Sequence, residues 1–157
     1  EWRFNGGQAR DLARLTSERA AWLRARPAMA RFGEWLIVHA DSPFYERFGE
    51  SVAEVTAAFA ALLAGSDPAG WDAAFGLWTG RRGFWGARGA ENLERFLARY
   101  GARGPVHGHT PIATLTGQAP EEVNEALVYQ GGRCGNVDGG LYLGGPGFAH
   151  PLGAPPP

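Results

Sequence analysis

Two short sequences carry the residue types best suited to chemistry. Val38-His39-Ala40-Asp41 closes one apolar run and Val106-His107-Gly108-His109-Thr110-Pro111 closes another, and together they hold three of the four histidines of the chain. Neutral imidazole is the commonest protein ligand for a transition metal. Histidines at a sheet edge can also be held by hydrogen bonds alone, but two clusters after two runs favour a metal site.

The apolar runs indicate how these histidines are positioned. Trp35-Leu36-Ile37-Val38 predicts a short buried strand, and a strand of an α/β sheet delivers the residues that follow it to the rim where ligands bind. In the second sequence, His107 and His109 face the same way if the segment is extended, and Gly108 leaves room for a close approach.

These motifs resemble the last two metal-ligand motifs of the calcineurin-like metallophosphoesterases, in the branch of bacterial-type serine/threonine protein phosphatases. The segment 129–142 is similar to the terminal strand, Asp-Gly turn and strand of that family, and the order and spacing fit over residues 2–148. The resemblance implies an α/β (α+β) fold, the C-terminal part of a four-layer β-sandwich flanked by helices. It places a partial metallophosphoesterase domain at 1–148 and a Pro/Gly-rich disordered tail at 149–157.

The resemblance also implies an activity, the hydrolysis of phosphate esters by two divalent ions, with manganese expected first and iron or zinc as alternatives. His39 and His109 would be ligands of one metal ion and should therefore lie close together, and His107 would support the site. An arginine would bind the phosphate through its planar fork of donors. Arg82 is favoured for this role, with Arg81 as the alternative. The substrate would be a phosphorylated protein or a nucleotide phosphoester such as a dinucleoside polyphosphate.

The motifs that the family carries in its N-terminal half do not occur in this sequence. These are Asp-x-His, Gly-Asp-x-x-Asp-Arg and Gly-Asn-His-Glu, which supply the remaining ligands and the bridging aspartate. Residues 2–7 look like the segment that follows the last of them, so we expect the chain to be the C-terminal portion of a longer protein. Because a two-metal mechanism needs ligands on both ions, the isolated chain should be inactive and hold at most one weakly bound ion. It should also show a long exposed sheet edge and a partly uncovered apolar sheet face.

Two alternatives belong to other classes of function. His39, His107, His109 and Cys134 could form a four-ligand zinc site in a module without catalysis. Cys134 lies in an expected strand, where a buried small hydrophobic residue is the simpler interpretation. The chain could also be an interaction fragment without a metal.

Composition bounds these possibilities. A chain of 157 residues with 45% hydrophobic residues fits one domain with a core. The net charge of −1 gives no basic field for nucleic acid or for a membrane surface. No run is long and apolar enough to span a membrane, and no secretory leader is recognisable, so a cytoplasmic location is expected. The oligomeric state is not indicated.

The elements expected to carry these motifs follow from capping residues and apolar periodicity. Helices are predicted over 8–26 with a break near Thr16-Ser17, over 52–64 after Ser51, over 68–78 after Asp67, and over 89–100 before Gly101. Strands are predicted over 105–108, 126–130, 133–138 and 141–143.

An aromatic cluster spans the helix predicted over 68–78 and the residues that follow it. It consists of Trp71, Phe75, Trp78, Phe84 and Trp85. Such a group could stack a base or a sugar, but its near-helical spacing is more typical of a core.

Overall fold

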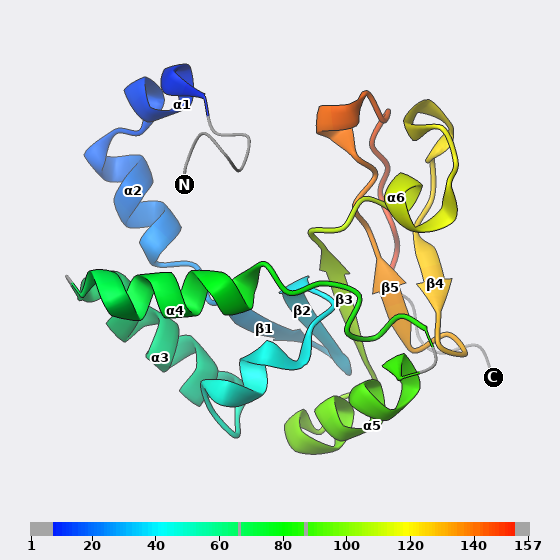
Figure 1. Ribbon diagram of the computed structural model, residues 1–157, viewed down its shortest axis with the longest axis horizontal. Coiled ribbons are helices and arrows are strands. Elements are labelled where there is room, and N and C mark those ends of the chain that lie inside the picture. The colour runs from blue at the N-terminus through cyan, green and yellow to red at the C-terminus, as the bar shows by residue number, and fades with distance from the viewer. Residues whose placement is uncertain (1–7, 66, 87, 153–157) are drawn as a thin grey trace.

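The computed structural model describes residues 8–65, 67–86 and 88–152. Their centre is a five-stranded mixed sheet in the order β1-β2-β3-β5-β4 (Figure 1). The strands are β1 (Met29–Phe32), β2 (Trp35–Ala40), β3 (Gly104–Gly108), β4 (Leu127–Tyr129) and β5 (Cys134–Asn136). Strands β2, β3 and β5 run parallel, and β1 and β4 pair antiparallel at the two edges. The mixed α/β class is therefore confirmed.

Helices connect and flank the strands. They are α1 (Ala9–Arg14), α2 (Ser17–Arg24), α3 (Val52–Ala64), α4 (Pro68–Trp78), α5 (Gly89–Tyr100) and α6 (Ile112–Thr116). Short 3-10 turns occur at Pro43–Arg47, Pro120–Glu122 and Leu141–Leu143. None of the described helices has the length and apolarity needed to cross a membrane.

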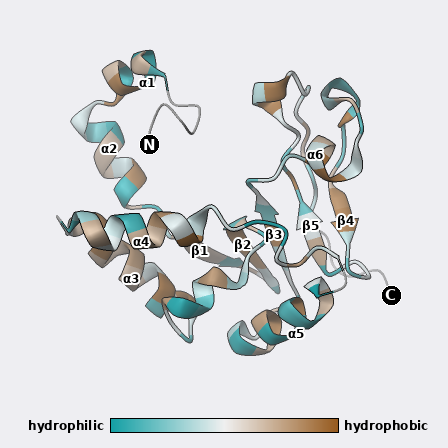
Figure 2. Ribbon diagram, in the orientation of Figure 1, coloured by the Kyte–Doolittle hydropathy of each residue, from teal (hydrophilic) through white to brown (hydrophobic). Residues whose placement is uncertain are grey.

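The capping signals of three helices are confirmed. Ser51 accepts a hydrogen bond from the backbone N–H of Glu54 at the start of α3, and Asp67 caps α4 through Ala69. Gly101 ends α5 with φ of 59°, a left-handed conformation that glycine adopts at little cost. Polar and apolar stretches alternate along α5 (Figure 2), as expected for a helix that covers a core on one side.

One face of the sheet is covered and forms the core. Met29, Leu36 and Val38 project from β1 and β2 on this face. Side chains from α3 and α5 close over it, namely Val55, Phe59, Leu93, Phe96, Leu97 and Tyr100. The core therefore fixes the position of β2, and parallel pairing holds β3 beside it, so that the ends of both strands carry the histidines.

The opposite face is apolar and partly uncovered, as expected. The strand registers align one residue from each strand in a row across it, in the order Ala30, Ile37, Val106, Gly135 and Val128. Within this row Ile37 is 37% exposed and Val128 is 51% exposed. We call this surface the open face.

Within the described part of the chain the sheet edges are short, contrary to the expected long edge, because β1 has four residues and β4 has three. The sequence also gave no signal for β1, whose residues Met-Ala-Arg-Phe become a strand through antiparallel pairing with β2.

One further expectation needs correction. Residues 141–143 form a 3-10 turn instead of a strand, because Gly140 and Gly144 flank it at φ of 68° and 99° and reverse the chain. The helix over 8–26 is divided into α1 and α2 by the Thr16 cap, as expected. Neither of these two helices contains a buried residue.

The expected disordered tail at 149–157 lies partly outside the described residues. Residues 149–152 form neither helix nor strand, and 153–157 are not described.

Candidate functional site

His39 and His109 meet because their strands are parallel neighbours. Ala40 of β2 is paired with Gly108 of β3, so the carboxyl ends of both strands reach the same edge of the sheet. The two imidazole rings have centroids 4.5 Å apart and planes inclined by 47°. The expected proximity is confirmed, and the metal-binding role stays a prediction.

His109 sits in an unusual backbone conformation. Its φ is 68°, a region that non-glycine residues rarely adopt and that recurs at functional sites. Burial lowers the pKa of its ring, and the nearby Arg81 guanidinium adds to this, while a backbone hydrogen bond with Thr79 acts in the opposite direction. Its Nε2 atom is buried and has no hydrogen-bond partner among the described residues. The ring is therefore neutral at pH 7, and its Nε2 makes no hydrogen bond to the described residues.

His39 is held between two rings. Trp78 lies edge-on at 5.6 Å between centroids, and His109 lies on another side. His39 is an exposed residue by its total surface, but the two neighbouring rings remove water from one part of its imidazole. Desolvation, reinforced by His109 and opposed by Asp138, lowers the pKa of His39 to about 4. Like His109, it is neutral at pH 7.

His107 has a different environment. Its Nδ1 lies 3.1 Å from the carbonyl oxygen of Gly108, which can only accept, so Nδ1 carries the proton. Its Nε2 then accepts from the Tyr129 hydroxyl at 2.8 Å. Both nitrogens are engaged, and burial lowers the pKa of the ring. These contacts suit the supporting role expected for His107.

Asp41 is a buried carboxylate beside the two histidines. The sequence analysis assigned no role to it. Its Oδ1 accepts from the backbone N–H of Arg82 at 2.9 Å, and its Oδ2 lies 3.5 Å from the Tyr129 hydroxyl. It is completely buried. The signal was present, because Asp41 closes the same motif as His39.

Arg81 and Arg82 are adjacent in the chain but have different surroundings. Arg82 has φ of 63°, and its backbone is fixed by Asp41. Arg81 lines a pocket together with His39 and His109. Arg81, the alternative in the sequence, is thus the guanidinium that the structure brings to the histidine pair.

The pocket has a volume of about 590 Å³, within the range of small-molecule sites. It is lined by His39, Leu63, Trp71, Phe75, Trp78, Thr79, Arg81, His109 and Tyr142. No carboxylate is among these lining residues. We call it the histidine pocket.

Cys134 is fully buried and has the character of an apolar residue. Burial raises the pKa of its thiol to about 12, so the thiolate that zinc requires is disfavoured. Across the ranges 8–65, 67–86 and 88–152, no group of three or more His, Cys, Asp or Glu side chains is placed to hold a metal ion. His39 and His109 fit two ligand positions of such an ion, since both are neutral and adjacent.

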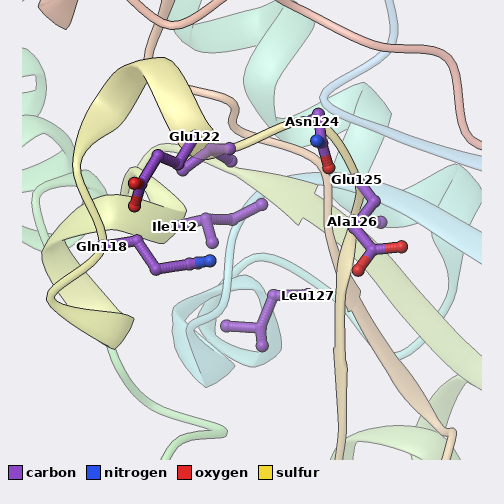
Figure 3. Close-up of a pocket in the computed structure, with 8 residues that line it drawn as sticks. Ile112, Gln118, Glu122, Asn124, Glu125, Ala126 and Leu127 are labelled. Carbon is purple, nitrogen blue, oxygen red and sulfur yellow. The ribbon is translucent and has the colours of Figure 1, made fainter.

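A second pocket lies between α6 and β4 (Figure 3). Its volume is about 90 Å³, which accommodates a few water molecules. Glu122 and Glu125 are the charged residues of its lining. It is too small for a substrate.

Comparison of the chain with protein-family models, with curated proteins and with solved structures gave no match.

Proposed function

We propose that this chain carries part of the active site of a metal-dependent phosphoester hydrolase of the serine/threonine-phosphatase-like metallophosphoesterase type. The observation that supports the proposal most directly is the His39–His109 pair, with ring centroids 4.5 Å apart, in a pocket that also contains Arg81. Two neutral imidazoles suit a divalent metal ion, and a guanidinium suits a phosphate.

Each residue then has a defined task. His39 and His109 would hold one divalent ion, manganese first, with iron or zinc as alternatives. Such an ion supplies Lewis acidity when bound. Arg81 would donate to the phosphate oxygens, and His107 would support β3 through Tyr129. Two protein ligands hold an ion only weakly, so the chain by itself is expected to be inactive.

Paramagnetic broadening by Mn²⁺ tests the proposal without requiring turnover. We expect substoichiometric Mn²⁺ to broaden the ring-proton NMR resonances of His39 and His109 first. His150, which is exposed and outside the histidine pocket, provides the internal control. Arg81→Gln should weaken the binding of inorganic phosphate to the Mn²⁺-loaded chain.

Equal broadening of all histidine resonances would contradict the proposed metal site. Phosphate binding that is unaffected by Arg81→Gln but lost in Arg82→Gln would transfer the phosphate role to Arg82.

A further inference from the structure

The histidine pocket has an aromatic wall that the proposed chemistry does not require. Trp71, Phe75 and Trp78 lie on α4 at spacings of four and three residues, and all three line this pocket. Residues three and four apart share one face of a helix, so one side of α4 presents three rings to the same space. The sequence-based expectation that the aromatic cluster forms core is met by Phe84, which is fully buried.

These rings are only partly used in packing within the chain. Phe75 is 36% exposed, and Trp71 is half-buried. Tyr142 of the 3-10 turn is 78% exposed and also lines the pocket. A flat apolar ligand could therefore be contacted from α4 and from Tyr142.

The other end of the pocket is polar and cationic. Arg81 belongs to its lining, and the ion pairs found among the described residues do not include this arginine. Its Nε donates a long hydrogen bond of 3.5 Å to the carbonyl oxygen of Thr79. With the two histidines beside it, this end suits an anion.

We infer that the histidine pocket selects phosphate compounds whose organic part is a flat aromatic ring, with the ring against α4 and the phosphate at Arg81. This inference rests on the proposed function for the identity of the anion. The shared chemistry, a ring joined to a phosphate, occurs both in aryl phosphates and in nucleoside monophosphates. An aliphatic phosphoester would leave the aromatic wall exposed to water.

Calorimetric titration of the chain, which is expected to be inactive by itself, tests this inference with two phosphonates and one nucleotide. Phenylphosphonate should bind about tenfold or more tightly than methylphosphonate, the gain expected for stacking of one ring. Adenosine 5′-monophosphate is the second arm. Tighter binding of phenylphosphonate indicates a ring close to phosphorus, and tighter binding of the nucleotide indicates a ring separated from it by a sugar.

Two pairs of variants identify the contacts. Phe75→Ala should remove much of the aromatic gain while leaving methylphosphonate binding unchanged. Its matched control is Phe32→Ala, since Phe32 is also exposed but lies on β1 outside the pocket. Arg81→Gln should weaken both phosphonates, and the exposed Arg47→Gln should weaken neither. Circular dichroism verifies that each variant is folded.

Failure of the inference and failure of the proposed function give different results. Equal affinities for phenylphosphonate, the nucleotide and methylphosphonate, all dependent on Arg81, would overturn the inference and leave the proposed function standing. Binding of benzyl alcohol as tight as that of phenylphosphonate, unaffected by Arg81→Gln, would overturn both.

Discussion

At the scale of single residues, the site depends on a neutral histidine pair and on a buried carboxylate beside it. Both histidines were recognisable in the sequence because each follows an apolar run. The sequence could not decide between Arg81 and Arg82, since adjacent arginines in a loop have the same local chemistry. What separates them is the backbone, because φ of 63° at Arg82 and its N–H bond to Asp41 fix that residue while Arg81 reaches the pocket.

Asp41→Ala should destabilise the fold by about 2 to 3 kcal/mol, because it removes the charged acceptor of the partly buried hydrogen bond from the Arg82 N–H. Asp41→Asn keeps an oxygen acceptor and should cost clearly less. Urea denaturation of the two variants measures the difference. Equal costs for Ala and Asn would mean that the Asp41–Arg82 bond does not stabilise the loop.

The pKa of His39 predicts how stability responds to acid. Its folded value of about 4 lies below the ordinary value of 6.5, so the unfolded chain takes up the proton first as the pH falls. Stability contributed by neutral His39 is therefore fully present above pH 6.5 and is lost between pH 6.5 and about 4. His39→Gln should make the free energy of unfolding less steeply dependent on pH in this window. An unchanged slope would show that the ring of His39 is not desolvated.

At the scale of elements, the sequence was informative where a local signal decides the structure. Helices α3, α4 and α5 carry their own caps and were predicted to within a residue or two. β1 was missed because it becomes a strand through its pairing with β2, which is not a local property. Residues 141–143 were assigned to a strand that the resemblance also implied after an Asp-Gly turn, whereas Gly140 and Gly144 determine a 3-10 turn.

The close packing of β3 between β2 and β5 can be tested by a substitution at Gly104. A Cβ added at Gly104 would meet the carbonyl oxygen of Arg133 and lie 2.7 Å from the ring of Trp35. Gly104→Ala should therefore destabilise the chain by about 1 to 3 kcal/mol through overpacking between β2, β3 and β5.

The matched control for this substitution is Gly76→Ala in α4. A Cβ at Gly76 meets nothing within 4 Å, so the variant should be stabilised by about 0.5 to 1 kcal/mol through helix propensity. Thermal denaturation should give shifts of opposite sign. Shifts of the same sign would contradict the register of β2 and β3.

At the scale of the whole molecule, the sheet is covered on one face and open on the other. The sequence predicted an uncovered apolar face from the resemblance, but the strand order and the row of residues across the open face required the structure. Apolar surface of this kind favours association.

Association through the open face should make the sedimentation-equilibrium mass of the chain rise with concentration. Ile37→Thr with Val128→Thr should reduce this rise, since threonine keeps the strand preference while adding a hydroxyl to the open face. Leu12→Gln on α1, where Leu12 is 53% exposed, is the control. A reduction by Leu12→Gln alone would move the association surface to α1 and α2.

The central claim is that one ion is shared by His39 and His109, and a double-mutant cycle for Mn²⁺ binding tests it most directly. Electron paramagnetic resonance of free Mn²⁺ gives the affinities of the unaltered chain, His39→Ala, His109→Ala and the double variant. We predict that each single substitution removes most of the affinity and that the double variant loses little more, because either ligand alone cannot hold the ion. Losses that add independently, or affinities that do not change at all, would contradict the claim.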